Sequence, residues 1–186
     1  MTTGGETLKP SVSDDDHVAG PADAPITLVE YGDFQCSHCA RAHHRVTAMQ
    51  QRFGDRLRFV FRNFPLGEVH PEAFHAAEAA ESVAASAGND AFWKMHDLLF
   101  EHQQDDEDAL DDAHLARYAT EAGGDAASVQ RDLDSDAFEE QVRSQFMSGV
   151  RSGVNGTPTF FVNGVRYDGD WSNVAAFAAD LEGAIA

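Results

Sequence analysis

The order of apolar patterns along the 186-residue chain restricts its fold more than any other feature. Residues 26–31 (ITLVEY) form a short apolar run, which predicts a buried strand. Apolar residues at helical spacing follow as far as Phe53, and Gly54 ends that helix. Alternation in residues 57–64 (LRFVFRNF) predicts a second strand. A strand, a helix and a strand in this order form a βαβ unit, whose two strands are parallel.

Residues 67–153 show only helical patterns. Strand patterns return at residues 159–162 and 165–167, and the Asn163-Gly164 pair between them is a strong hairpin signal. An amphipathic helix ends the chain. We therefore expect an α/β core interrupted by an all-helical block. The predicted boundaries are a disordered acidic tail (1–20), a core (21–66 and 154–186) and an inserted helical domain (67–153).

The chain is strongly acidic, with 13 Lys and Arg against 32 Asp and Glu, a net charge of −19. This charge argues against nucleic-acid binding, which depends on basic side chains that neutralise phosphates. No apolar run is long enough for a transmembrane helix, so we expect no membrane insertion. Lys occurs only at positions 9 and 94, a pattern typical of the acidic, hydrated surfaces of halophilic proteins. An ordinary acidic protein is the alternative.

Residues 1–20 contain no apolar segment of the kind that a signal peptide needs. Unless an export signal has been removed, we expect a cytoplasmic location.

Both cysteines lie in Cys36-Ser37-His38-Cys39, where the first strand gives way to the first helix. A CxxC sequence near a βαβ pattern is typical of a redox pair. Free N–H groups and the dipole at a helix N-terminus favour an anion, here the thiolate of Cys36. The dipole contributes only ~0.3–1 kcal/mol, less than the ~1.36 kcal/mol of one pKa unit. We therefore expect further contacts: a protonated His38, and a Ser37 hydroxyl that bonds the thiolate or caps the helix.

Two other uses of the cysteines are weaker. A static disulfide that closes so short a loop would remove little entropy from the unfolded chain. A zinc site could use the two cysteines with His43 and His44, but there is no second CxxC. We expect a redox-active disulfide, with no metal and no cofactor.

Two segments together resemble the DsbA-type thioredoxin-fold disulfide oxidoreductases. They are residues 29–39 (VEYGDFQCSHC) and 156–164 (GTPTFFVNG), and residues 92–97 (FWKMHD) resemble the inserted helical domain of that group. The resemblance extends from about Ala24 to the C-terminus. It implies a thioredoxin fold with an inserted helical domain. Ser37 departs from the Pro that many relatives have at this position.

The resemblance also assigns roles to single residues. It implies that Cys36 is the nucleophile and Cys39 the resolving thiol. Thr157 and Pro158 would be joined by a cis bond beside the disulfide, where a substrate backbone pairs. Glu30 corresponds to a buried acid that relays a proton, although a solvated strand residue is an equal alternative.

The implied function is exchange of disulfides with protein thiols through Cys36 and Cys39, most simply as an oxidase. Its partners would be cysteine-containing proteins and a redox partner that recycles the disulfide. A thioredoxin-like reductase or isomerase is the nearest alternative. A binding or chaperone module that uses the cysteines as a clamp or metal site, and a glutathione-dependent enzyme on a related fold, are the others.

Overall fold

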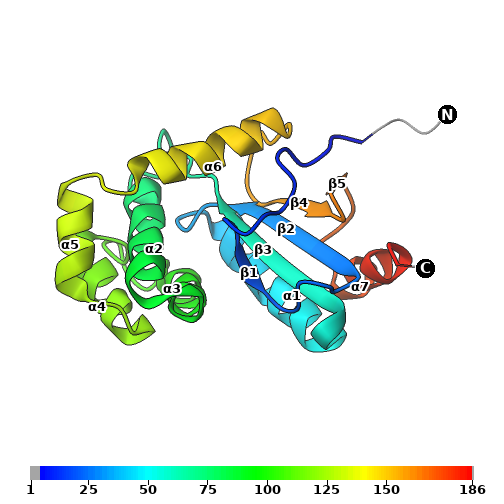
Figure 1. Cartoon of the computed structure of the whole chain (residues 1–186), viewed down its shortest axis with the longest axis horizontal. Coiled ribbons are helices and arrows are strands. Elements are labelled where there is room, and N and C mark those ends of the chain that lie inside the picture. Colours follow the sequence, from blue (N-terminus) through cyan, green and yellow to red (C-terminus); the bar gives the residue numbers. More distant parts are fainter. Residues whose placement is uncertain (1–4, 186) are drawn as a thin grey trace.

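The computed structural model describes residues 5–185, in which one five-stranded sheet is accompanied by seven α-helices (Figure 1). The strands are β1 (His17–Ala19), β2 (Ile26–Gly32), β3 (Leu57–Asn63), β4 (Thr159–Val162) and β5 (Val165–Tyr167). The helices are α1 (Ser37–Phe53), α2 (Ala73–Ala87), α3 (Asn89–His102), α4 (Asp112–Ala122), α5 (Ala126–Asp134), α6 (Glu139–Arg151) and α7 (Val174–Gly183). The α/β class predicted from the sequence is confirmed.

The sheet has the strand order β1-β3-β2-β4-β5. Strands β2 and β3 are parallel and α1 connects them, so the predicted βαβ unit is present. Strand β4 is antiparallel to β2 and forms a hairpin with β5. Asn163 and Gly164 in its turn have φ angles of 49° and 83°, the left-handed conformation that such a turn requires.

Strands β2 and β3 are buried on both faces of the sheet, which explains why residues 26–31 of β2 are almost uniformly apolar. On one face, Leu28 and Phe59 belong to a core that includes residues of α1 and α7. On the other face, Val29, Val60 and Phe161 form a second cluster.

Helices α2 to α6 occupy the chain between β3 and β4. Helix α2 packs against α3, α4, α5 and α6, so these helices form one block beside the sheet. Helix α6 runs from that block back to β3 (Figure 1). None of the helices in residues 5–185 combines the length and the apolar character that crossing a bilayer requires.

The expected disordered tail is wrong for residues 5–20. Strand β1 pairs antiparallel with β3 at the edge of the sheet, and Thr7 forms a bridge with Val165. The side chain of Leu8 is buried in the second cluster, against which Val12 and Val18 also pack. The few apolar residues of this acidic segment therefore pack on one face of the sheet. Their order depends on contacts with distant strands, which the local sequence does not reveal. Residues 1–4 lie outside the described part.

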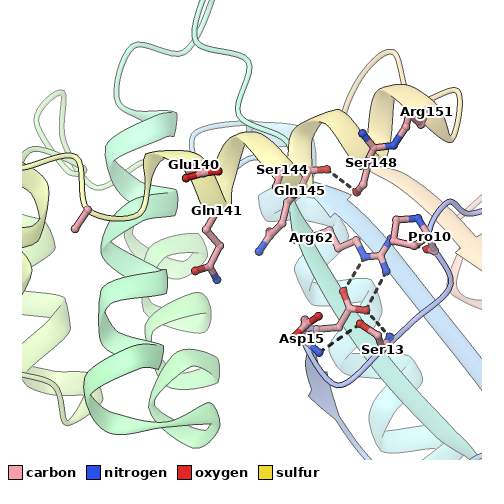
Figure 2. A pocket seen from close by; sticks show the side chains of 12 residues that line it. Pro10, Ser13, Asp15, Arg62, Glu140, Gln141, Ser144, Gln145, Ser148 and Arg151 are labelled. Atoms are coloured by element: carbon pink, nitrogen blue, oxygen red, sulfur yellow. Dashed lines mark hydrogen bonds and ion pairs between the residues drawn. The ribbon is translucent and has the colours of Figure 1, made fainter.

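A buried arginine of β3 shows how closely this N-terminal arm, residues 5–20, is fixed. The Arg62 guanidinium donates to both carboxylate oxygens of Asp16, at 2.7 and 2.9 Å, and to the carbonyl of Pro10 at 3.0 Å. It also donates to the hydroxyl of Tyr31. A cavity of about 620 Å³ lies between the arm and α6 (Figure 2). Its lining includes Arg62 but neither cysteine.

Candidate active site

Cys36 and Cys39 lie where β2 is followed by α1. Cys36 is the N-cap residue of α1 and has an extended backbone (φ −76°, ψ 119°). No side chain caps this helix by a hydrogen bond, so its first N–H groups are available to the sulfur. Cys39 follows in the first turn. Both are free thiols, and their exposed fractions are 5% and 0%.

The surroundings of Cys36 lower the pKa of its thiol from 9.0 to about 5. The largest cause is a hydrogen bond from the Cys39 side chain. Burial opposes it, and contacts with Thr157 and the backbone N–H groups of Cys39 and His38 lower the pKa further. Near neutral pH, Cys36 is therefore a thiolate, the nucleophilic form.

Cys39 behaves in the opposite way. Its pKa is raised well above 9.0, chiefly by burial and then by the hydrogen bond it gives to Cys36. Cys39 therefore stays protonated next to the Cys36 anion. The pair therefore combines a nucleophilic thiolate at Cys36 with a protonated thiol at Cys39.

Glu30 lies on β2 behind the pair and is 1% exposed. Burial, followed by repulsion from Cys36, raises the pKa of its carboxyl group to about 8. Its Oε1 atom has no hydrogen-bond partner among the described residues. Since Glu30 also raises the pKa of Cys39, a proton-carrying acid lies within electrostatic reach of both sulfurs.

The segment before β4 brings Thr157 and Pro158 to the cysteines. The bond between them is cis, and the carbonyl oxygen of Thr157 lies 3.6 Å from the sulfur of Cys36. Thr157 is 121 positions from Cys36 in the chain. The pairing of β4 with β2 brings the two residues together.

Ser37 and His38 lie between the cysteines. Ser37 is half-buried and His38 is exposed. The Nδ1 atom of His38 is 2.7 Å from a guanidinium nitrogen of Arg41. Within residues 5–185, no hydrogen bond or ion pair joins the His38 ring to Cys36; the contribution of His38 is its backbone N–H.

Sequence reasoning missed the residues that hold the loop before Cys36. The buried carboxylate of Asp33 accepts from the backbone N–H of Gln35 at 2.7 Å and of Leu66 at 2.8 Å, and it pairs with His70 at 2.8 Å. From the end of α3, the amide of Gln103 donates to the carbonyls of Phe34 and Cys36, at 2.9 and 3.2 Å.

The zinc alternative that combines the cysteines with His43 and His44 has no support in the arrangement of the described residues. There, His43 is grouped as a candidate metal ligand with His96 and Asp97, and no cysteine belongs to that group.

A family model described as thioredoxin matches residues 12–179. The chain belongs to the thioredoxin family. Solved structures place it with the DsbA-type members of this family. BdbD from Bacillus subtilis, in its oxidised form, is 26% identical with a TM-score of 0.86 and 98% coverage of both chains. The α-DsbA1 protein of Wolbachia pipientis is 17% identical, with a TM-score of 0.79 and coverage of 94% of this chain and 92% of that one.

Two further proteins are similar to this chain, one in structure and one in sequence. MdbA from Corynebacterium diphtheriae, described as a thiol-disulfide oxidoreductase, has a TM-score of 0.72 at 19% identity and covers 98% of this chain and 94% of its own. A protein of Mycolicibacterium vanbaalenii named Na(+)/H(+) antiporter NhaA 1 is 40% identical over 174 residues, which are 92% of this chain. The chain spans only about a quarter (27%) of the length of that relative.

The expected cytoplasmic location is wrong. The matching structures of DsbA, BdbD and MdbA belong to extracytoplasmic oxidases. The expectation rested on the lack of an apolar segment in residues 1–20, whereas disulfides form and persist in oxidising compartments outside the cytoplasm.

Proposed function

We propose that this thioredoxin-family chain oxidises pairs of thiols in other proteins by exchanging the Cys36–Cys39 disulfide with them. The observation that carries the proposal is the opposite acidity of the two sulfurs, with the pKa of Cys36 lowered to about 5 and that of Cys39 raised. A stabilised Cys36 thiolate favours the dithiol form and makes the disulfide an oxidant.

The reaction begins with the Cys36–Cys39 disulfide. A substrate thiolate attacks the sulfur of Cys36, the bond between the two cysteines breaks, and Cys39 leaves as a thiolate that takes up a proton. A second substrate thiolate then attacks the substrate sulfur of the mixed disulfide and releases Cys36 as a thiolate. The substrate loses two electrons and gains a disulfide, and the enzyme becomes the dithiol.

Other residues assist these steps in the proposed mechanism. Glu30, with a pKa of about 8, is protonated at pH 7 and supplies the proton that Cys39 takes up. The backbone beside Thr157 and Pro158 receives an extended segment of the substrate by strand pairing. Ser37 and His38 begin α1, and the backbone N–H of His38 helps to hold the Cys36 anion.

The partners proposed are proteins with pairs of cysteines, and a redox protein that reoxidises the dithiol after each cycle. The helical block is proposed as an inserted domain between the two parts of the core, residues 21–66 and 154–186.

The reduction potential of the Cys36–Cys39 pair, measured by equilibrium with glutathione, tests the direction. A value of about −120 mV supports the oxidase, and a value of about −270 mV indicates a thioredoxin-like reductase instead. Cys36→Ala should abolish oxidation of a dithiol peptide, whereas Cys39→Ala should accumulate mixed disulfides on Cys36. Oxidation by Cys36→Ala at the parent rate contradicts the proposal.

A further inference from the structure

A small cavity between α1 and α3 contains two histidines and a carboxylate that the proposed exchange reaction does not use. His43 lies on α1, one turn beyond Cys39, and His96 and Asp97 lie on α3. The three side chains line a cavity of about 80 Å³ together with Gln50. Since a water molecule occupies about 30 Å³ in the liquid, this cavity has room for an ion with a bound water.

The potential ligand atoms are close to the spacing that a metal ion requires. The Nδ1 atoms of His96 and His43 lie 3.0 and 3.9 Å from the same Asp97 oxygen, and one ligand atom from each residue falls within 4.8 Å of the others. Tetrahedral Zn²⁺ with bonds of about 2.0–2.1 Å holds its ligand atoms about 3.3 Å apart. Shifts of an ångström or so in these side chains would complete the arrangement.

One ring nitrogen of the buried His96 side chain is left without a hydrogen bond among the described residues, and the other contacts Asp97. His96 is 2% exposed, and its Nε2 atom has no hydrogen-bond partner among the described residues. Phe34, Phe61 and Phe100 surround the ring edge to face. The Nδ1 atom lies 3.0 Å from an Asp97 oxygen, a contact that either a proton on Nδ1 or a cation between the two atoms satisfies.

We propose that His43, His96 and Asp97 bind one divalent transition-metal ion of the zinc class, with the fourth position open to water or to the Gln50 side chain. Two imidazoles and one carboxylate are a donor set that suits Zn²⁺. The ion joins α1, which carries the cysteines, to α3 of the helical block. The site therefore stabilises the packing of the two parts and takes no part in the disulfide exchange.

Zinc binding to the oxidised protein tests this site, because the Cys36–Cys39 disulfide leaves no thiol to bind the metal. Equilibrium dialysis against ZnCl₂ should find one tightly bound ion per chain. Asp97→Asn, at a side chain that is 52% exposed, should weaken this binding by about 10- to 100-fold or more. Zinc should also raise the thermal midpoint of the parent protein but not that of the variant.

A second His–Asp pair supplies the matched control. His102 and Asp105 are in contact at 2.6 Å on the surface. Among the described residues, neither belongs to a group of three potential metal ligands. Asp105→Asn should bind zinc as the parent does. The second variant, His43→Asn, should lose binding like Asp97→Asn while its far-ultraviolet circular dichroism stays unchanged. Equal zinc affinity in the parent and Asp97→Asn, or an equal loss in Asp105→Asn, overturns the proposal.

Discussion

At the residue scale, the two sulfurs of one CxxC sequence differ in acidity because they occupy different positions in the first turn of α1. Cys36 receives hydrogen bonds from the Cys39 side chain and from backbone N–H groups, whereas Cys39 is buried behind it. The proposed reactivity therefore depends on geometry that the motif alone does not specify.

The acidity of Cys36 predicts a pH dependence of the reduced protein. Its folded-state pKa of about 5 lies below the ordinary 9.0. The contribution of the thiolate to the stability of the reduced protein therefore reaches its full value above about pH 9. This stabilisation shrinks as the pH falls and is lost below about pH 5. At pH 7 the stabilisation of the thiolate changes the equilibrium constant between the disulfide and the dithiol by about 100-fold, which is roughly 60 mV. Urea unfolding of the reduced proteins from pH 4 to 8 should show this loss as a stability difference between the parent and Cys36→Ser that changes with pH, because the opposite pH dependence of Glu30, whose pKa is raised, is present in both.

Glu30 predicts a change in the rate profile. Glu30→Gln retains the shape of the side chain but removes the proton that the proposed mechanism transfers to Cys39. We expect dithiol oxidation at pH 7 to slow by about 10-fold or more, and the inflection near pH 8 to disappear. Glu78→Gln is the matched control, because Glu78 is also buried, with a pKa raised to about 7 by burial, but lies on α2. An unchanged profile in Glu30→Gln contradicts the proposed proton transfer.

The sequence led to some of these residues and not to others, for physical reasons. Cys36 and Cys39 are adjacent to a recognisable strand–helix boundary, and Thr157-Pro158 begins a recognisable strand. The contacts of Asp33 and Gln103 are different, because each joins segments that are far apart in the chain. A polar side chain in a loop gives no local signal of the distant backbone group that it will bind.

At the scale of elements, Gln103 connects the end of α3 to the loop that carries Cys36. Gln103→Ala removes donors to two carbonyls, each hydrogen bond contributing about 0.5–1.5 kcal/mol. We expect the free energy of unfolding to fall by about 1 kcal/mol or more and the pKa of Cys36 to rise, as measured by the pH dependence of thiol alkylation. Gln104→Ala, at the exposed neighbouring position, should change neither; equal effects of both variants contradict this role.

The N-terminal arm supplies the counter-charge for a buried arginine of β3. Removing one partner of a buried ion pair leaves an uncompensated charge and costs about 3–5 kcal/mol. Asp16→Asn should therefore lower the free energy of unfolding by an amount near the lower end of this range, because the amide keeps one hydrogen-bond acceptor for Arg62. Asp15→Asn, at the exposed neighbouring position, should stay within about 0.5 kcal/mol of the parent. Urea unfolding of the two variants compares them directly, and similar losses contradict a specific role for Asp16.

Elements with strong local patterns were predicted well, and the arm was not. The limits of α1 and of the β4–β5 hairpin follow from Gly54 and from Asn163-Gly164, whose conformations are set locally. Strand β1 is only three residues long and exists because β3 has a free edge. Acidic composition predicted disorder there because composition does not include pairing with a distant strand.

At the scale of the whole molecule, the net charge of −19 acts on stability through repulsion among acidic groups. Arginines pair with some of them in the described residues, as in Arg56–Glu182 and Arg143–Glu139, but 13 basic residues cannot neutralise 32 acidic ones. Repulsion between exposed charges is screened when salt shortens the Debye length from about 10 Å at about 0.1 M to about 3 Å at about 1 M.

Salt should therefore stabilise this protein, and the charge itself provides the control. At pH 7, the urea midpoint should rise between about 0.1 and about 1 M NaCl, because screening relieves more repulsion in the compact state than in the unfolded chain. Near pH 4.5, the isoelectric point of the sequence, the net charge approaches zero and the same increase in salt should have a much smaller effect. Equal salt effects at both pH values would mean that salt acts on apolar burial and not on charge. An unchanged midpoint at pH 7 would mean that the acidic surface imposes no salt requirement on the fold.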